Sequence, residues 1–282
     1  MQFRTETRRR KPRLIALALL TAFLAGLTFA APATASPAKE GGGKGGAKPS
    51  IVLVHGAFAD ASGWSGVIER LQSDGYTVYA PPNTLRAVPT DAEYLKSFLS
   101  TIPGPIVLVG HSYGGAVITN AATGNKNVKA LVYIAAFALA EGESVQQANE
   151  LGGGHTDVIN HLVTRPIPGA TDGNQDAYID PVWFHRLFAQ DLSKKQAAVM
   201  AASQRPGALA SLVTPSGPPA WKTIPSWYMV ASNDRIIPPE AERAMAKRAG
   251  AKTVEVRSSH VPMISQPKKV VDLILSAVKA TR

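Results

Sequence analysis

Short apolar runs alternate with longer amphipathic stretches along most of the chain. Several of these runs have no polar face, which is typical of strands buried on both faces of a parallel sheet. Together with two runs that contain polar residues, at 76–80 and 253–256, the runs lie at residues 51–54, 105–109, 130–134 and 227–231. Stretches with apolar residues at helical spacing separate them, at about residues 63–74, 94–99, 115–122, 239–249 and 267–279. Strands that alternate with helices predict a doubly wound, mainly parallel α/β sheet.

The rhythm breaks between about residues 137 and 220. This stretch holds three consecutive glycines at 152–154, several prolines and an amphipathic segment at 182–188. An insertion of this length between two sheet strands predicts a helical cap, which starts after the strand ending near Ala135. Caps of this kind shape a substrate pocket and exclude water from it.

The N-terminus has the order of a secretory signal peptide. A basic segment at residues 8–13 precedes an apolar stretch at 14–30, and small residues follow at Ala33-Thr34-Ala35. The alternative is a transmembrane anchor, but this stretch is shorter than the ~20 residues that a spanning helix needs. We therefore expect residues 1–35 to be removed after Ala35, which leaves a secreted protein without a stable membrane anchor. Residues 36–49 are rich in glycine and lysine and predict a flexible linker before a folded domain at 50–282.

Charge and cysteine content exclude several classes of function. The net charge is +10, but residues 1–35 hold six basic side chains and one acidic, and residues 36–49 hold three and one. The remaining residues carry a net charge of only about +3, which is too small to indicate a nucleic-acid-binding protein. The chain has no cysteine, so neither disulfides nor thiolate metal sites are expected.

The sequence Gly-His-Ser-Tyr-Gly at residues 110–114 is the most specific chemical signal. It directly follows a predicted buried strand and directly precedes a predicted helix. A serine on so sharp a strand-to-helix turn has its hydroxyl exposed above a helix N-terminus. Ser112 is therefore a candidate nucleophile; the alternative is an ordinary helix N-cap.

Two further residues follow strand ends later in the chain. Asp234 comes just after the strand at 227–231, and His260 follows the strand at 253–256. Because carboxyl ends of parallel strands meet at one sheet edge, both should lie near Ser112. A serine nucleophile needs a base, and that base needs a carboxylate to hold its tautomer. Asp180 and Asp191 are rival carboxylates, but neither follows a sheet strand.

Four segments together carry a family resemblance. They are residues 54–58, 110–115, 231–234 and 259–263. With them, residues 50–280 resemble the α/β-hydrolase fold proteins of the esterase and hydroxynitrile-lyase-like branch. The resemblance implies the triad Ser112, Asp234 and His260, in the chain order of that fold. It also implies an oxyanion hole of two backbone N–H groups, one from Tyr113 and one from Ala57 or Phe58.

The expected activity is hydrolysis of small to medium carboxylic esters through an acyl-enzyme on Ser112, with no metal and no cofactor. Dehalogenases and epoxide hydrolases of this fold use an aspartate nucleophile, which Ser112 argues against. Plant-type hydroxynitrile lyases have a lysine where this chain has Val261. The alternatives left open are a perhydrolase or lyase reaction on the same triad, and a ligand-binding protein with little turnover.

Overall fold

The computed structural model describes residues 48–170 and 172–281. Its main sheet has six parallel strands in the order β2-β1-β3-β4-β8-β9. They are β1 (Ser50–Val54), β2 (Val78–Tyr79), β3 (Ile106–Ser112), β4 (Val128–Ala136), β8 (Ser226–Ala231) and β9 (Lys252–Val256). The central strands β1, β3, β4 and β8 are almost wholly buried, because helices cover both faces of the sheet. The predicted doubly wound parallel sheet is confirmed.

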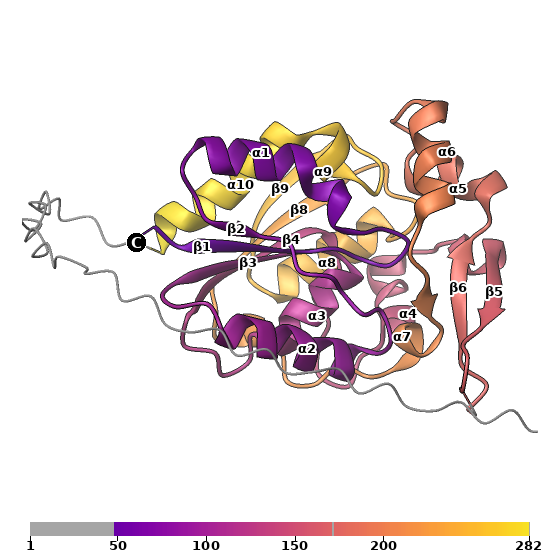
Figure 1. Ribbon diagram of the computed structural model, residues 1–282, viewed down its shortest axis with the longest axis horizontal. Helices are drawn as coiled ribbons and strands as arrows, with labels where there is room; N and C mark the ends of the chain where they lie inside the picture. The colour runs from indigo at the N-terminus through magenta and orange to yellow at the C-terminus, as the bar shows by residue number, and fades with distance from the viewer. Residues whose placement is uncertain (1–47, 171, 282) are drawn as a thin grey trace, which may run out of the picture. The chain divides into compact units, whose positions relative to one another are not determined.

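The helices form a layer on each side of this sheet (Figure 1). One layer holds α1 (Ser65–Ser73), which follows the 3-10 turn η1 (Ala61–Trp64), together with α9 (Pro262–Ser265) and α10 (Pro267–Ala280). The other holds α2 (Val88–Ser100), α3 (Tyr113–Ala121) and α8 (Pro239–Arg248). In α10 the buried residues recur at helical spacing, from Val270 through Ile274 to Val278, which gives the helix its core-facing stripe.

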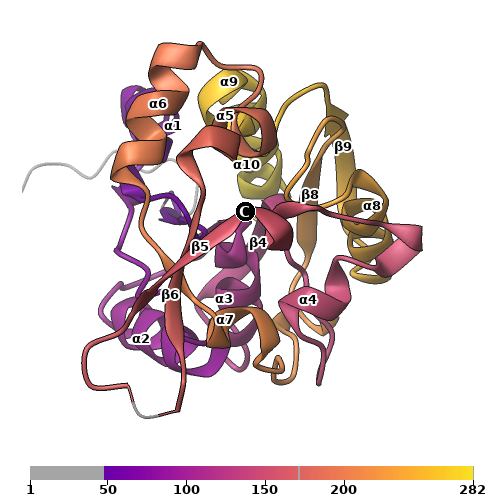
Figure 2. The same ribbon diagram turned by 90° about the vertical axis from the view of Figure 1, so that its right-hand side faces the viewer.

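The insertion between β4 and β8 lies over the carboxyl edge of the sheet, in front of it in Figure 2. Its helices are α4 (Val145–Ala148), α5 (Pro181–Phe188), α6 (Lys194–Ser203) and α7 (Ala210–Val213), with 3-10 turns η2 (Leu151–Gly153), η3 (Val158–His161) and η4 (Ala220–Lys222). It also contains an antiparallel sheet of β5 (Leu162–Pro166), β6 (Gln175–Ile179) and β7 (Gly207–Ala208). The cap is thus mixed, rather than helical as expected.

Side-chain alternation explains the unexpected cap strands. In β6, Ala177 and Ile179 are buried while Asp176 and Tyr178 are only half-buried, a pattern of period two that favours a strand. The turn between β5 and β6 contains Gly169 and Gly173, both at positive φ. At the end of the expected linker, Pro49 is buried, and Lys48 Nζ donates to the carbonyl of Asp74 at 2.8 Å.

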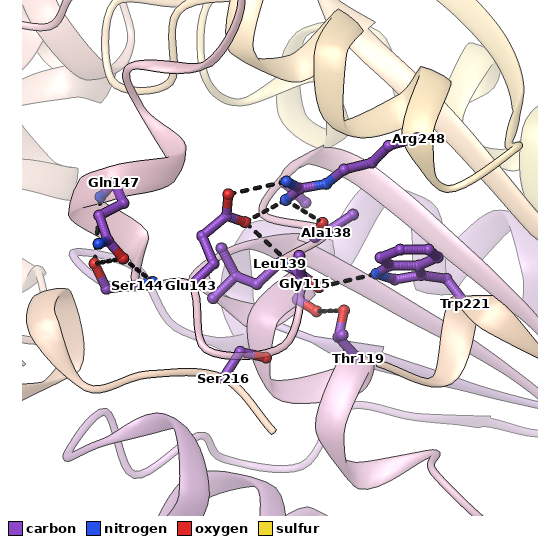
Figure 3. A network of polar contacts seen from close by, with 12 residues as sticks. Gly115, Thr119, Ala138, Leu139, Glu143, Ser144, Gln147, Ser216, Trp221 and Arg248 are labelled. Carbon is purple, nitrogen blue, oxygen red and sulfur yellow. Dashed lines mark hydrogen bonds and ion pairs between the residues drawn. The ribbon is translucent and has the colours of Figure 1, made fainter. Parts of the chain in front are cut away.

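A polar network holds the segment that leaves β4 (Figure 3). The Arg248 guanidinium, at the end of α8, forms an ion pair with the Glu143 carboxylate and donates to the Ala138 carbonyl at 2.9 Å. Glu143 also accepts the N–H of Ala140 at 3.0 Å. Trp221 Nε1 donates to the Leu139 carbonyl at 2.9 Å. These contacts fix the start of the cap to the main body of the fold.

In the part of the chain that the structure describes, no helix combines the length and apolar character needed to cross a membrane. The expected signal peptide at 1–35 lies outside the described residues, as does nearly all of the expected linker.

Candidate active site

Ser112 occupies a strained turn between β3 and α3. Its backbone has φ 53° and ψ −127°, a conformation that costs a non-glycine residue about 1–3 kcal/mol. The surrounding glycines permit this turn through close contacts. A β-carbon on Gly110 would lie 2.7 Å from the carbonyl oxygen of Gly114, and one on Gly114 would overlap the carbonyl of Val54. The glycine spacing of the motif therefore follows from two close backbone approaches around Ser112.

His260 and Asp234 form a buried pair at the same edge of the sheet. His260 Nδ1 lies 2.5 Å from Asp234 Oδ2, and both side chains are fully buried. The other oxygen of Asp234 accepts backbone N–H groups from Ile236 at 2.7 Å and Ile237 at 3.1 Å. Since a carboxylate can only accept, Nδ1 of His260 carries the hydrogen. His260 Nε2 is then an acceptor, and it has no hydrogen-bond partner among the described residues.

Two neighbours hold His260 in place. His111, the residue before Ser112, donates from Nε2 to the backbone carbonyl of His260 at 2.7 Å. Burial lowers the pKa of His111 well below its usual value, so its ring stays neutral. From the cap, the ring of Phe188 packs edge-on against His260 with centroids 5.0 Å apart. His260 is therefore positioned both by the serine turn and by α5.

Glu242, on α8, places a second acid beside Asp234. Its side chain is fully buried, and Oε2 accepts the N–H of Ala231 at 3.0 Å. Burial, together with the neighbouring Asp234, raises the pKa of Glu242 well above its usual value. A protonated Glu242 donates a hydrogen bond to Asp234, so that it adds no negative charge of its own at this buried position.

The two rival carboxylates, Asp191 and Asp180, form hydrogen bonds with other groups of the described chain and not with a histidine ring. Asp191 Oδ2 accepts from Ser259 N at 3.0 Å and from Ser258 Oγ at 3.2 Å. Asp180 caps α5 by accepting the N–H of Val182 at 2.9 Å. Asp234 is the carboxylate that reaches the His260 ring.

The candidate oxyanion donors differ in their availability. Phe58 N–H already donates to the Arg205 carbonyl at 2.8 Å. Ala57 N–H makes no hydrogen bond within the described chain. Tyr113 is the first residue of helix α3, so its N–H has no acceptor within the helix. His55, just before this loop, uses both ring nitrogens structurally: Nδ1 donates to the Gly56 carbonyl and Nε2 accepts from Asn83 N, each at 2.9 Å. Of the two alternatives, Ala57 is therefore the residue with a free N–H.

A narrow cavity of about 40 Å³, here called the nucleophile pocket, opens onto Ser112. Its lining is mostly apolar and comes from the loop after β1, the serine turn and the cap. The lining residues are Ala57, Phe58, Ser112, Tyr113, Phe137, Val145, Gln146, Asn149, Val158, Ile159, Leu162, Ser211, Leu212 and Ile236. No Lys, Arg, Asp or Glu is among them, which favours an uncharged ligand.

A further property of the site concerns the clustering of potential metal ligands. Among the residues that the structure describes, no group of three or more His, Cys, Asp or Glu side chains could hold a metal ion.

Comparison with known proteins identifies the family. The model of the alpha/beta hydrolase family matches residues 51–273, which is most of the chain. The chain belongs to the alpha/beta hydrolase family. The matched region contains the whole main sheet except the first residue of β1, as well as Ser112, Asp234 and His260.

Relatives within this family are hydrolases and esterases. Methylesterase 17 of Arabidopsis thaliana is 25% identical over 253 residues, covering 81% of this chain and 91% of that protein. A pyrethroid hydrolase of Sphingobium wenxiniae is 26% identical over 254 residues, covering 79% and 85%. Among solved structures, polyneuridine aldehyde esterase shares the fold with a TM-score of 0.69 at 22% identity, covering 82% of this chain and 99% of that one.

Sequence reasoning did not find three polar residues of this region. Glu242 lies in the first turn of α8, where an acid is expected simply to balance the helix dipole. Asn149 and Ser211 lie in the cap, 62 positions apart in the numbering, without a motif that links them. Only the folded chain brings them to the pocket.

Proposed function

We propose that the protein is a serine carboxylesterase that acts through an acyl-enzyme on Ser112. The observation that carries this proposal is the buried His260–Asp234 pair with a free Nε2, next to a strained serine that opens onto an apolar pocket. Family membership and the esterases among its relatives support it.

The reaction follows from the atoms in place. Ser112 Oγ attacks the ester carbonyl carbon while its proton passes to His260 Nε2. The oxyanion is stabilised by the N–H groups of Tyr113 and Ala57, each worth ~10²–10³ in rate in comparable enzymes. The carbon–oxygen bond to the alcohol then breaks, and the alcohol leaves with the proton from His260. Water, deprotonated by His260, attacks the carbonyl carbon of the acyl-enzyme. The bond from this carbon to Ser112 Oγ breaks, Ser112 takes the proton back from His260, and the carboxylic acid is released.

Replacement of Ser112 tests the assignment. The Ser112→Ala variant should lose nearly all hydrolysis of p-nitrophenyl acetate and all labelling by a fluorophosphonate probe. Mass spectrometry of the labelled wild-type protein should place the adduct on Ser112. A folded wild-type protein that neither labels nor turns over would instead support a ligand-binding role.

We also propose that the protein is exported and acts outside the cytoplasm. The support is the order of charge, apolar stretch and small residues within positions 1–35. N-terminal sequencing of protein recovered from the culture medium should find Ser36 as the first residue. Full-length protein retained in the membrane fraction would favour the anchor alternative.

A further inference from the structure

The nucleophile pocket contains two buried polar groups that the protein itself does not pair. Asn149 Oδ1 and Ser211 Oγ have no hydrogen-bond partner among the described residues. Asn149 is 9% exposed and Ser211 is 1% exposed. Both residues line the same pocket as Ser112. Two unpaired polar groups therefore occur in one otherwise largely apolar cavity.

Such groups are unusual, because a buried polar atom without a hydrogen bond costs about 1–3 kcal/mol. Local structure does not account for either of them. Ser73 and Ser203, in helices elsewhere in this fold, donate to the carbonyl four residues earlier, whereas Ser211 makes no such bond. Asn149 is the C-terminal cap residue of α4, and its backbone N–H donates to the Val145 carbonyl. This cap does not involve the side chain of Asn149.

Ser211 lies on the side of the pocket formed by the loop after β1. A β-carbon placed on Gly207 would lie 3.1 Å from Ala57 Cβ and 3.4 Å from Ser211 Oγ. The Ser211 hydroxyl therefore lies at most about 6.5 Å from the Cβ of Ala57, the residue with the free N–H in the oxyanion loop. Helix α4, which Asn149 follows directly, packs against α7, which contains Ser211.

We propose that Asn149 and Ser211 bind a hydroxyl group of the substrate, so that the enzyme selects esters with a hydroxyl near the carbonyl of an otherwise apolar acyl chain. This inference rests on the proposed esterase function. A hydroxyl donates to Asn149 Oδ1 and accepts from Ser211 Oγ, so it satisfies both groups at once. A methyl group in its place leaves both unpaired. A charged substituent would find no counter-ion among the lining residues.

Matched pairs of esters test this selection. p-Nitrophenyl β-hydroxybutyrate and isovalerate have the same shape and exchange a hydroxyl for a methyl group; the lactate and isobutyrate esters form a second pair. For at least one pair, the purified wild-type protein should favour the hydroxy ester in kcat/KM by about 10-fold or more, which corresponds to about 1.4 kcal/mol.

The double variant Asn149→Leu with Ser211→Ala should abolish or reverse this preference, with a higher kcat/KM for the methyl ester. Gln146→Leu is the matched control, because Gln146 lines the same pocket but is exposed, and it should leave the ratio unchanged. Thermal melting of all variants verifies that they are folded.

The possible failures are distinguishable. If the wild type hydrolyses both esters of each pair equally well, or if the double variant keeps the preference, the hydroxyl site is wrong while the esterase function stands. If no ester is hydrolysed and Ser112 does not label, the esterase function itself is wrong, and the hydroxyl site with it.

Discussion

At the residue scale, Glu242 is an acid that the fold keeps in its neutral form. Its pKa is raised above the usual 4.5 by burial and by Asp234. From pH 4.5 upward, the unfolded chain loses this proton while the folded protein keeps it. The folded state then binds more protons, so its free energy of unfolding falls as the pH rises, until Glu242 ionises in the folded state as well.

The Glu242→Gln variant should lack this loss, because a neutral amide replaces the carboxyl and can still donate to Asp234. Its free energy of unfolding relative to wild type should be pH-independent below about pH 4 and then increase by up to ~1.4 kcal/mol per pH unit. Urea denaturation at several pH values from about 4 to 8 measures the difference. Glu240→Gln, on the exposed side of the same helix turn, is the control. A difference that stays constant over this range would show that Glu242 ionises as it does in water.

Asp234 and Asp191 allow a direct comparison of two carboxylates close to the His260 loop. In Asp234→Asn, the side-chain amide would donate toward Nδ1 and force the hydrogen of His260 onto Nε2, where it blocks proton transfer from Ser112. We expect kcat to fall by about 10⁴ with little change in KM. Asp191→Asn weakens hydrogen bonds to the serines of the His260 loop, Ser258 and Ser259 among them, and should lower kcat far less. Steady-state kinetics of both variants with p-nitrophenyl acetate measures the two losses in kcat. Equal losses would contradict the assignment of Asp234, and not Asp191, as the partner of His260.

At the scale of elements, the sequence predicted the body better than the cap. The central strands are continuous apolar runs whose burial on both faces leaves few alternatives. Cap strand β5 offers no such signal, because it contains Thr164 and Arg165 and pairs with β6 across a glycine-rich turn. The antiparallel cap sheet depends on pairing that an isolated stretch does not reveal. For the same reason, Asn149 and Ser211 could not be linked before folding.

The end of α8 offers a prediction about how the cap is anchored. Arg248→Met leaves Glu143 largely buried without its cation and removes the donor to the Ala138 carbonyl. The free energy of unfolding should fall by about 2 kcal/mol, or roughly 4–8 °C in Tm for a domain of this size. Arg243→Met is the matched control on the same helix. Its pair with Glu255 is about half exposed on both sides, and its loss should cost less than about 0.5 kcal/mol. Comparable shifts in Tm for the two variants would contradict a special role for the buried pair.

At the scale of the whole molecule, the strand order explains why the sequence could place the candidate residues at one edge of the sheet. The strand order places β1 and β3 side by side, and the chain runs outward from them in both directions. Ligands bind at such a switch point, beyond the carboxyl ends of the strands. Ala57 follows β1, Ser112 ends β3, and Asp234 and His260 follow β8 and β9. Topology thus gathers residues from four strand ends, whereas the substrate depends on cap side chains whose positions topology does not fix.

The folded body should function without the N-terminal segment. Residues 48–281 contain the complete main sheet, both helix layers, the cap and every residue of the nucleophile pocket. A chain of residues 45–282 keeps the Lys48 contact with Asp74 and every helix and strand that the structure describes, so it should melt within about 2 °C of the longer protein. Its kcat/KM for p-nitrophenyl acetate should match that of the longer chain. Circular dichroism melting and steady-state kinetics on both proteins provide the measurement. A truncated chain that folds but loses activity would mean that residues before 45 contribute to the site.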